Sequence, residues 1–228
     1  MAFLPYAGLL IVYGNVAAYV AGSALAPGPA GVLLGAALVV AVFAYARADG
    51  LSLGQLGLRR ERLGLGVAVG SALALVGVAA AMILLRYPPL VAGPVTYAPL
   101  AAMSTPDLAV RIALTMPLDT IIPEELAFRG LLLAQLLRRY RVRAAVVVSA
   151  LAFAGWHAVI VTTTIAQTSL AGDRLFAGLG LVGAFLAVFG GGVSFAALRV
   201  TTGSLAAPIA AHWVFNSALL VGLSALRS

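Results

Sequence analysis

Six ionisable side chains lie inside strongly apolar stretches of this sequence, where a charged group is costly. They are Asp119, Glu124, Glu125, Arg129, His157 and His212, and the two histidines are the only ones in the chain. On insertion scales, an ionisable side chain at the centre of a membrane helix costs about 2.5–3.5 kcal/mol. Such groups usually form a site or pair with one another, so these six mark where chemistry is expected.

The helical spacing to neighbouring charged residues predicts different roles for the two adjacent glutamates. Glu125 and Arg129 are four residues apart and meet on one helix face, which favours a structural ion pair. Glu124 is rotated by about 100° from that face and has no cationic residue at helical spacing. It is therefore the candidate reactive carboxylate, with helix packing as the alternative. Asp119 lies shortly before Pro123, and we interpret it as the cap of a restarted helix.

Two further segments each offer polar groups on one helical face. Phe153 and His157 are four residues apart, as are His212 and Asn216. We expect Glu124, His157, His212 and Asn216 to converge on one cavity. A carboxylate that accepts a proton from water, beside groups that donate to an oxyanion, would hydrolyse an acyl bond.

The sequence does not contain the motifs that several other hydrolase mechanisms require. The histidines are 55 positions apart and form no His-Glu-x-x-His motif, and the chain has no cysteine. A serine nucleophile stays open because Ser149, Ser194 and Ser217 are available, although none lies in a Gly-x-Ser-x-Gly elbow.

The amino-acid composition indicates that the helices carrying these site residues lie in a lipid bilayer. Of 228 residues, 63% are hydrophobic and 9% are charged, against about 45–50% and about 25% in soluble proteins. We predict an all-α, polytopic transmembrane helix bundle of about seven spans, with six to eight possible. The predicted spans are residues 6–26, 31–46, 63–85, 107–137, 144–164, 173–199 and 205–226. Pro117 and Pro123 should kink or break the fourth.

The whole chain, 1–228, is predicted to be a single membrane domain. Residues 1–106 supply N-terminal spans and a loop, and residues 107–228 supply the catalytic core spans. Arginines concentrate in the loops after the second, fourth and sixth spans, which predicts a multi-pass protein of the cell membrane with a cytoplasmic N-terminus. The net charge of +7 is explained by these loops, so no nucleic-acid partner is expected.

Three motifs resemble those of a known family. Glu124-Glu125-Leu-Ala-Phe-Arg129 fits Glu-Glu-x-x-x-Arg, Phe153-Ala-Gly-Trp-His157 fits Phe-x-x-x-His, and His212-Trp-Val-Phe-Asn216 fits His-x-x-x-Asn. All three occur in the family's order on separate hydrophobic segments. The chain therefore resembles the CPBP family of CAAX proteases and bacteriocin-processing enzymes, which are glutamic intramembrane endopeptidases.

The resemblance implies a membrane-embedded protease that needs no metal and no other cofactor. In it, Glu124 activates water, His157 helps to hold that water, and His212 and Asn216 stabilise the oxyanion. Glu125, Arg129 and Phe153 support the geometry. The implied partners are the lipid bilayer and a peptide or membrane-protein substrate of unassigned sequence.

Three alternatives remain open from the residues alone. Glu124, His157 and His212 could be three zinc ligands of a metallopeptidase. The same groups could serve a transporter or proton relay. The chain could also be a non-catalytic membrane scaffold or immunity protein.

Overall fold

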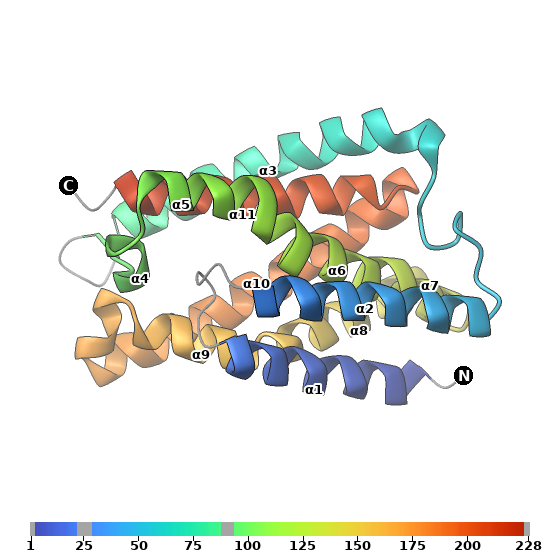
Figure 1. Cartoon of the computed structure of the whole chain (residues 1–228), viewed down its shortest axis with the longest axis horizontal. Helices are drawn as coiled ribbons and strands as arrows, with labels where there is room; N and C mark the ends of the chain where they lie inside the picture. Colours follow the sequence, from blue (N-terminus) through green and yellow to red (C-terminus); the bar gives the residue numbers. More distant parts are fainter. Residues whose placement is uncertain (1–2, 22–28, 88–93, 226–228) are drawn as a thin grey trace.

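The structure is a computed structural model that describes residues 3–21, 29–87 and 94–225. These residues form a helical bundle without strands, with one isolated antiparallel bridge between Tyr97 and Thr168. The first half contains α1 (Phe3–Ala21), α2 (Pro29–Ala48), η1 (Arg60–Arg62), α3 (Leu63–Arg86), α4 (Ala98–Ala101), α5 (Thr105–Val110), η2 (Arg111–Thr115) and η3 (Pro117–Ile121). The second half contains α6 (Ile122–Glu125), η4 (Leu126–Leu132), α7 (Leu133–Leu137), α8 (Val142–Trp156), α9 (Ala158–Ala166), η5 (Ser169–Gly172), α10 (Arg174–Thr202) and α11 (Ala206–Ala225). Figure 1 shows their arrangement.

The predicted all-helical membrane bundle is confirmed at the level of its architecture. Four described helices are long and apolar enough to cross a membrane: α2, η1 with α3, α10 and α11. A fifth crossing results if α8 and α9, which are bent by 50°, form one span. The count of seven is not confirmed. The apolar part of α1 is a shorter helix, and residues 22–26 of the first predicted span lie outside the described residues.

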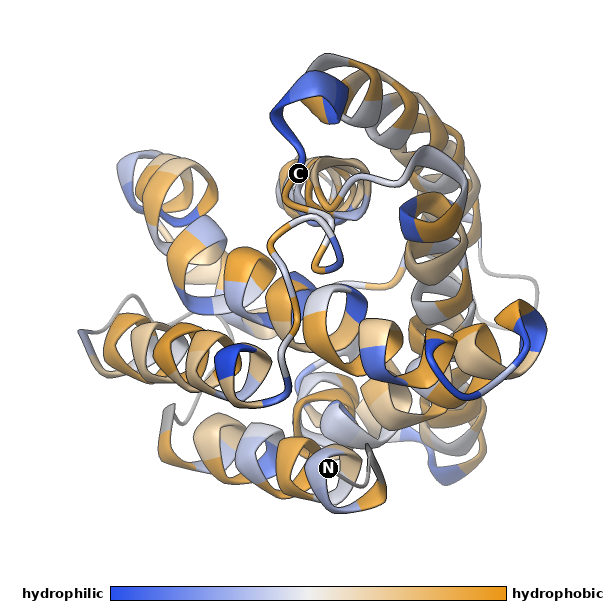
Figure 2. Cartoon of the chain, turned by 90° about the vertical axis from the view of Figure 1, so that its right-hand side faces the viewer, coloured by the Kyte–Doolittle hydropathy of each residue, from blue (hydrophilic) through white to orange (hydrophobic). Residues whose placement is uncertain are grey.

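The outer surface of the bundle is apolar. Large hydrophobic side chains are exposed along several helices, among them Leu33 at 69%, Val76 at 69% and Leu186 at 64%. Most of the ribbon in Figure 2 is coloured as hydrophobic, and the hydrophilic stretches are short. Water would not tolerate such a surface over a whole domain, whereas lipid chains do.

The helix that carries the two glutamates is the core of the bundle. Every residue from 123 to 136 is buried, and α1, α2, α8 and α10 pack around this segment. On the other side, α3 and α11 lie side by side (Figure 1). Gly70 permits this approach, because a Cβ atom there would lie 2.1 Å from the carbonyl oxygen of Ala207.

The predicted fourth span departs from regular α-helical geometry. Between Arg111 and Leu132 the backbone passes through three π-helical turns, η2, η3 and η4. Pro117 is at the start of η3 and Pro123 is in the first turn of α6. The chain stays helical here, but its α-helical geometry gives way to π-helical turns around the two prolines, where a kink or break was predicted. The path from α5 to α6 bends visibly in Figure 1.

Three arginine-bearing loops meet at one end of the bundle. Arg138, after α7, donates to the carbonyl oxygen of Asp49, after α2, at 3.0 Å. Arg199, near the end of α10, donates to the carbonyl oxygen of Gln55 at 2.8 Å. Arg62 donates to the carbonyl oxygen of Thr202 at 3.0 Å. The loops that the sequence assigns to one side of the membrane therefore lie together.

Candidate functional site

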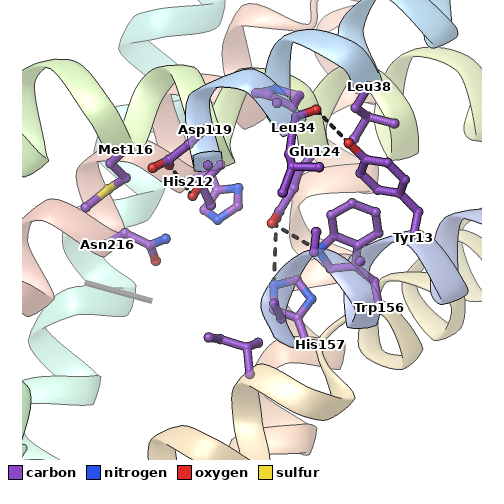
Figure 3. Close-up of a pocket in the computed structure, with 18 of the residues that line it drawn as sticks. Tyr13, Leu34, Leu38, Met116, Asp119, Glu124, Trp156, His157, His212 and Asn216 are labelled. Carbon is purple, nitrogen blue, oxygen red and sulfur yellow. Dashed lines mark hydrogen bonds and ion pairs between the residues drawn. The ribbon is translucent and has the colours of Figure 1, made fainter. Parts of the chain in front are cut away.

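One cavity brings the four predicted site residues together. It has a volume of about 360 Å³ and is lined by Glu124 from α6, by His157 at the junction of α8 and α9, and by His212 and Asn216 from α11. Helices α1 and α2 also line it, with glycine and alanine residues and with Tyr13, Leu34 and Leu38. Figure 3 shows Glu124 between His212 and His157, with Asn216 near His212. Residues from segments far apart in sequence thus line one cavity inside the bundle.

Glu124 is buried, with one satisfied and one unsatisfied carboxylate oxygen. Its exposure is 6%. Its Oε1 accepts a hydrogen bond from the indole N–H of Trp156 at 3.1 Å. Its Oε2 lies 3.7 Å from Nε2 of His157, too far for a direct hydrogen bond. No donor among the described residues reaches Oε2, so this oxygen is able to accept a proton from another molecule.

The backbone fixes the orientation of His157. Its Nδ1 lies 2.8 Å from the carbonyl oxygen of Phe153, and a carbonyl can only accept, so Nδ1 carries the proton. Nε2 then faces the Glu124 carboxylate. The ring centroids of Phe153 and His157 are 4.3 Å apart, so Phe153 positions the imidazole through both its backbone and its ring.

Glu125 connects Arg129 to His212. Its Oε1 lies 3.0 Å from NH1 of Arg129 and 2.9 Å from Nδ1 of His212. Glu125 and Arg129 are fully buried, and the guanidinium carbon lies 4.0 Å from the ring centroid of Phe153. The expected structural ion pair is present, and it also holds the second histidine, a link that the sequence spacing did not reveal.

The contact with Glu125 determines which atom of His212 is available. Since Nδ1 donates to a carboxylate, Nε2 is the ring nitrogen left for a ligand. It carries a proton only when the imidazole is cationic. The ring stacks on Phe195 at a centroid distance of 5.0 Å, which holds it against the cavity wall.

Asn15 on α1 supports the backbone around His157, and the sequence motifs did not identify it. Its Oδ1 accepts the backbone N–H of Val159 at 2.7 Å, and its Nδ2 donates to the carbonyl oxygen of Gly155 at 2.9 Å. These two backbone groups flank His157 at the 50° break between α8 and α9. An asparagine within the apolar first segment was the available signal, because a buried amide requires partners.

The residues before Asn15 support the indole that contacts Glu124. The ring of Tyr13 stacks on Trp156 at a centroid distance of 5.9 Å. A Cβ atom at Gly14 would lie 2.2 Å from the indole, so only glycine permits this approach. The N-terminal helix thus contacts the site through three consecutive residues.

Arg111 and Asp119 form a second polar cluster in the same cavity. Arg111 is 6% exposed and its NH1 pairs with Oδ2 of Asp119. The sequence interpretation of Asp119 as a helix cap is therefore wrong: α6 has Ile121 as its N-cap residue and no side-chain cap. The two residues are eight apart in sequence, and the π-helical turns η2 and η3 lie in the segment that joins them.

The described residues form no metal site. Within residues 3–21, 29–87 and 94–225, no group of three histidine, aspartate or glutamate side chains converges to hold an ion. Glu124 faces His157 while Glu125 holds His212, so the two histidines belong to different pairs. This arrangement differs from the three-ligand zinc site left open by the sequence.

Comparisons with known proteins agree with the motifs. Residues 106–218 match the family described as type II CAAX prenyl endopeptidase Rce1-like. Neither the curated proteins nor the solved structures gave a match. The matched segment is about half of the chain and contains all three motifs. It is a protease family, and the several apolar helices agree with a multi-pass membrane protein. The chain belongs to the Rce1-like family of type II CAAX prenyl endopeptidases.

Proposed function

We propose that this protein is an intramembrane endopeptidase that hydrolyses peptide bonds with a water molecule activated by Glu124. The observation that carries the proposal is the facing pair of Glu124 Oε2 and His157 Nε2, which lie 3.7 Å apart in the cavity. A water molecule bound between these atoms would donate one proton to each. The family to which the chain belongs supports the protease activity.

In the first step Glu124 acts as the general base. The carboxylate removes a proton from the bound water, and the resulting hydroxide attacks the scissile carbonyl carbon. His157 orients the water, because Phe153 holds its Nδ1 proton and leaves Nε2 toward the cavity. The new C–O bond converts the carbonyl oxygen into an oxyanion.

In this mechanism Asn216 and His212 stabilise that oxyanion. The amide N–H of Asn216 donates without any change of charge. His212 donates through Nε2 in its cationic form, for which Glu125 is the counter-charge at 2.9 Å. Removing one oxyanion donor typically lowers the rate by about 10²–10³-fold.

The intermediate then collapses to products. The C–N bond breaks, and protonated Glu124 gives its proton to the leaving amine, which restores the carboxylate. One water is consumed, and one acid and one amine are formed. Neither a metal nor another cofactor enters these steps. The substrate is a peptide or a membrane protein.

The proposal is tested by reconstituting the purified protein in liposomes with a pool of short peptides. Mass spectrometry of the products identifies any cleaved bond. We expect the wild-type protein to cleave and His157→Ala to lose activity, while Ser149→Ala, which removes a buried hydroxyl that donates to the Phe128 carbonyl oxygen, keeps it. Unchanged cleavage by His157→Ala would contradict the mechanism, and an inactive Ser149→Ala would point to a serine nucleophile.

A further inference from the structure

The arginine-rich end of the bundle carries the whole net charge of the protein. Nine of the fourteen arginines fall in residues 47–62, 138–143 and at position 199, together with two of the seven acidic residues. This difference equals the net charge of +7, so the charges of the rest of the chain cancel. The loop between α2 and α3 lies at the right of Figure 1, and Figure 2 looks onto this end. Arg199 is the buried member of this group, with an exposure of 9%.

The loop before α3 encloses the guanidinium group of Arg199. Its NH2 donates to the carbonyl oxygen of Gln55 at 2.8 Å. A Cβ atom at Gly57, where φ is +85°, would lie 2.2 Å from Nε of Arg199, so glycine allows the loop to close over the side chain. The Nε–H is buried and has no acceptor among the described residues. The contacts inside the protein therefore use only part of the hydrogen-bonding capacity of Arg199.

Arg199 also lacks a counter-charge within the protein. No carboxylate among the described residues forms an ion pair with it. The described side chain whose charge acts on it is Arg59, which has the same sign. Arg59 is exposed, and its Nε makes a long contact of 3.4 Å with the carbonyl oxygen of Gly54. A buried cation beside a like charge is unfavourable unless an anion compensates both, so this pair favours an anion bound from outside.

The surroundings of the two arginines are apolar, which favours a lipid over a free ion. Leu53, Leu58 and Leu63 are exposed at 59%, 38% and 50%. Leu63 begins α3, which together with η1 is long and apolar enough to cross a membrane. Cationic and apolar side chains thus alternate where the chain enters the bilayer. A free phosphate would use only the arginines, whereas a phospholipid offers its phosphate to the arginines and its acyl chains to the leucines.

We propose that Arg59 and Arg199 form a binding site for the phosphate group of an anionic phospholipid. Arginine suits phosphate because its planar N–H groups match the geometry of the phosphate oxygens. Arg62 donates to the carbonyl oxygen of Thr202 at 3.0 Å and holds the start of α3 against the end of α10. Neither Arg59 nor Arg199 lines the cavity that contains Glu124, so the lipid site is separate from the proposed catalytic centre and does not depend on it.

The test measures lipid binding to the purified full-length protein in a neutral detergent. Short-chain phosphatidylglycerol, short-chain phosphatidylcholine and inorganic phosphate are titrated separately at constant ionic strength, with thermal unfolding as the readout and native mass spectrometry to count bound lipids. We expect a saturable rise in melting temperature and a retained lipid with phosphatidylglycerol only. An equal rise with inorganic phosphate would overturn the lipid assignment, and an equal rise with phosphatidylcholine would overturn the requirement for an anionic headgroup.

Arg59→Gln and Arg143→Gln distinguish a defined site from a general attraction to negative lipids. Both arginines are exposed in the arginine-rich group, so each substitution removes one positive charge from the same end. Arg59→Gln should weaken the apparent affinity for phosphatidylglycerol about fivefold, and Arg143→Gln should leave it almost unchanged. Arg59 is the position replaced because Arg199 also holds the Gln55 carbonyl, and its loss would destabilise the loop. Equal weakening by the two substitutions would overturn the site.

Discussion

Asn15→Ala tests whether the first helix determines the geometry of the active site. The substitution removes the acceptor for the Val159 N–H at 2.7 Å and the donor to the Gly155 carbonyl at 2.9 Å. Hydrogen bonds between membrane helices contribute about 0.6 kcal/mol on average and about 1.7 at most. Two of them give an expected loss of about 1–3 kcal/mol in the free energy of unfolding.

The effect on catalysis should exceed this loss of stability. The two backbone groups flank His157, so their release allows the 50° break to relax and displaces the imidazole from Glu124. A displacement of about 1 Å at a reacting group can cost about 10²-fold in rate. We therefore expect kcat to fall by about 10²-fold in the folded protein, with KM almost unchanged.

The assay combines thermal unfolding in detergent with peptide cleavage in liposomes. Ser149→Ala is the control, because it removes one hydrogen bond from the same helix, α8, to the Phe128 carbonyl at 3.3 Å. It should lower the melting temperature slightly and leave kcat unchanged. A destabilised Asn15→Ala protein that retains the wild-type kcat would refute the reasoning and reduce Asn15 to a packing residue.

Three further predictions concern the core, metals and topology. Glu125→Gln leaves Arg129 without its counter-charge and removes the carboxylate that contacts His212. Because breaking a buried ion pair costs about 3–5 kcal/mol, the melting temperature in detergent should fall. An unchanged melting temperature would contradict this prediction. Peptide cleavage should survive EDTA and phenanthroline, and activity that is lost and then restored by zinc would favour a metallopeptidase. A cysteine introduced at Arg141, in a chain that has none, should react only with a reagent supplied from the cytoplasmic side, and labelling from outside would reverse the predicted orientation.

The sequence predicted which residues share the cavity, because they are close in helical spacing or stand out chemically. Glu125 and Arg129 are one turn apart, and the two histidines are the only ones in the chain. Ionisable groups are so costly in lipid that their positions alone indicate a site. The catalytic roles and the division of the chain at residue 107 stay predictions.

The supporting contacts could not be predicted in the same way. Asn15 meets Val159 across 144 residues, and no local pattern encodes such a pair. Arg111 reaches Asp119 through π-helical turns, which shift the usual four-residue register. The number of spans was also hard to predict, because the predicted fourth span, residues 107–137, is too long for a simple crossing and is divided by Pro117 and Pro123.

The catalytic role of Glu124 is tested most directly by comparing turnover with peptide binding in Glu124→Gln. Glutamine keeps the size of the side chain and can still accept the hydrogen bond from Trp156, but it cannot take a proton from water. We predict an unchanged melting temperature, retained peptide binding and a loss of turnover of about 10²–10⁴-fold, as expected for removal of a general base. Wild-type turnover in Glu124→Gln, together with a stable but inactive Glu125→Gln, would contradict the assignment and move the base by one residue.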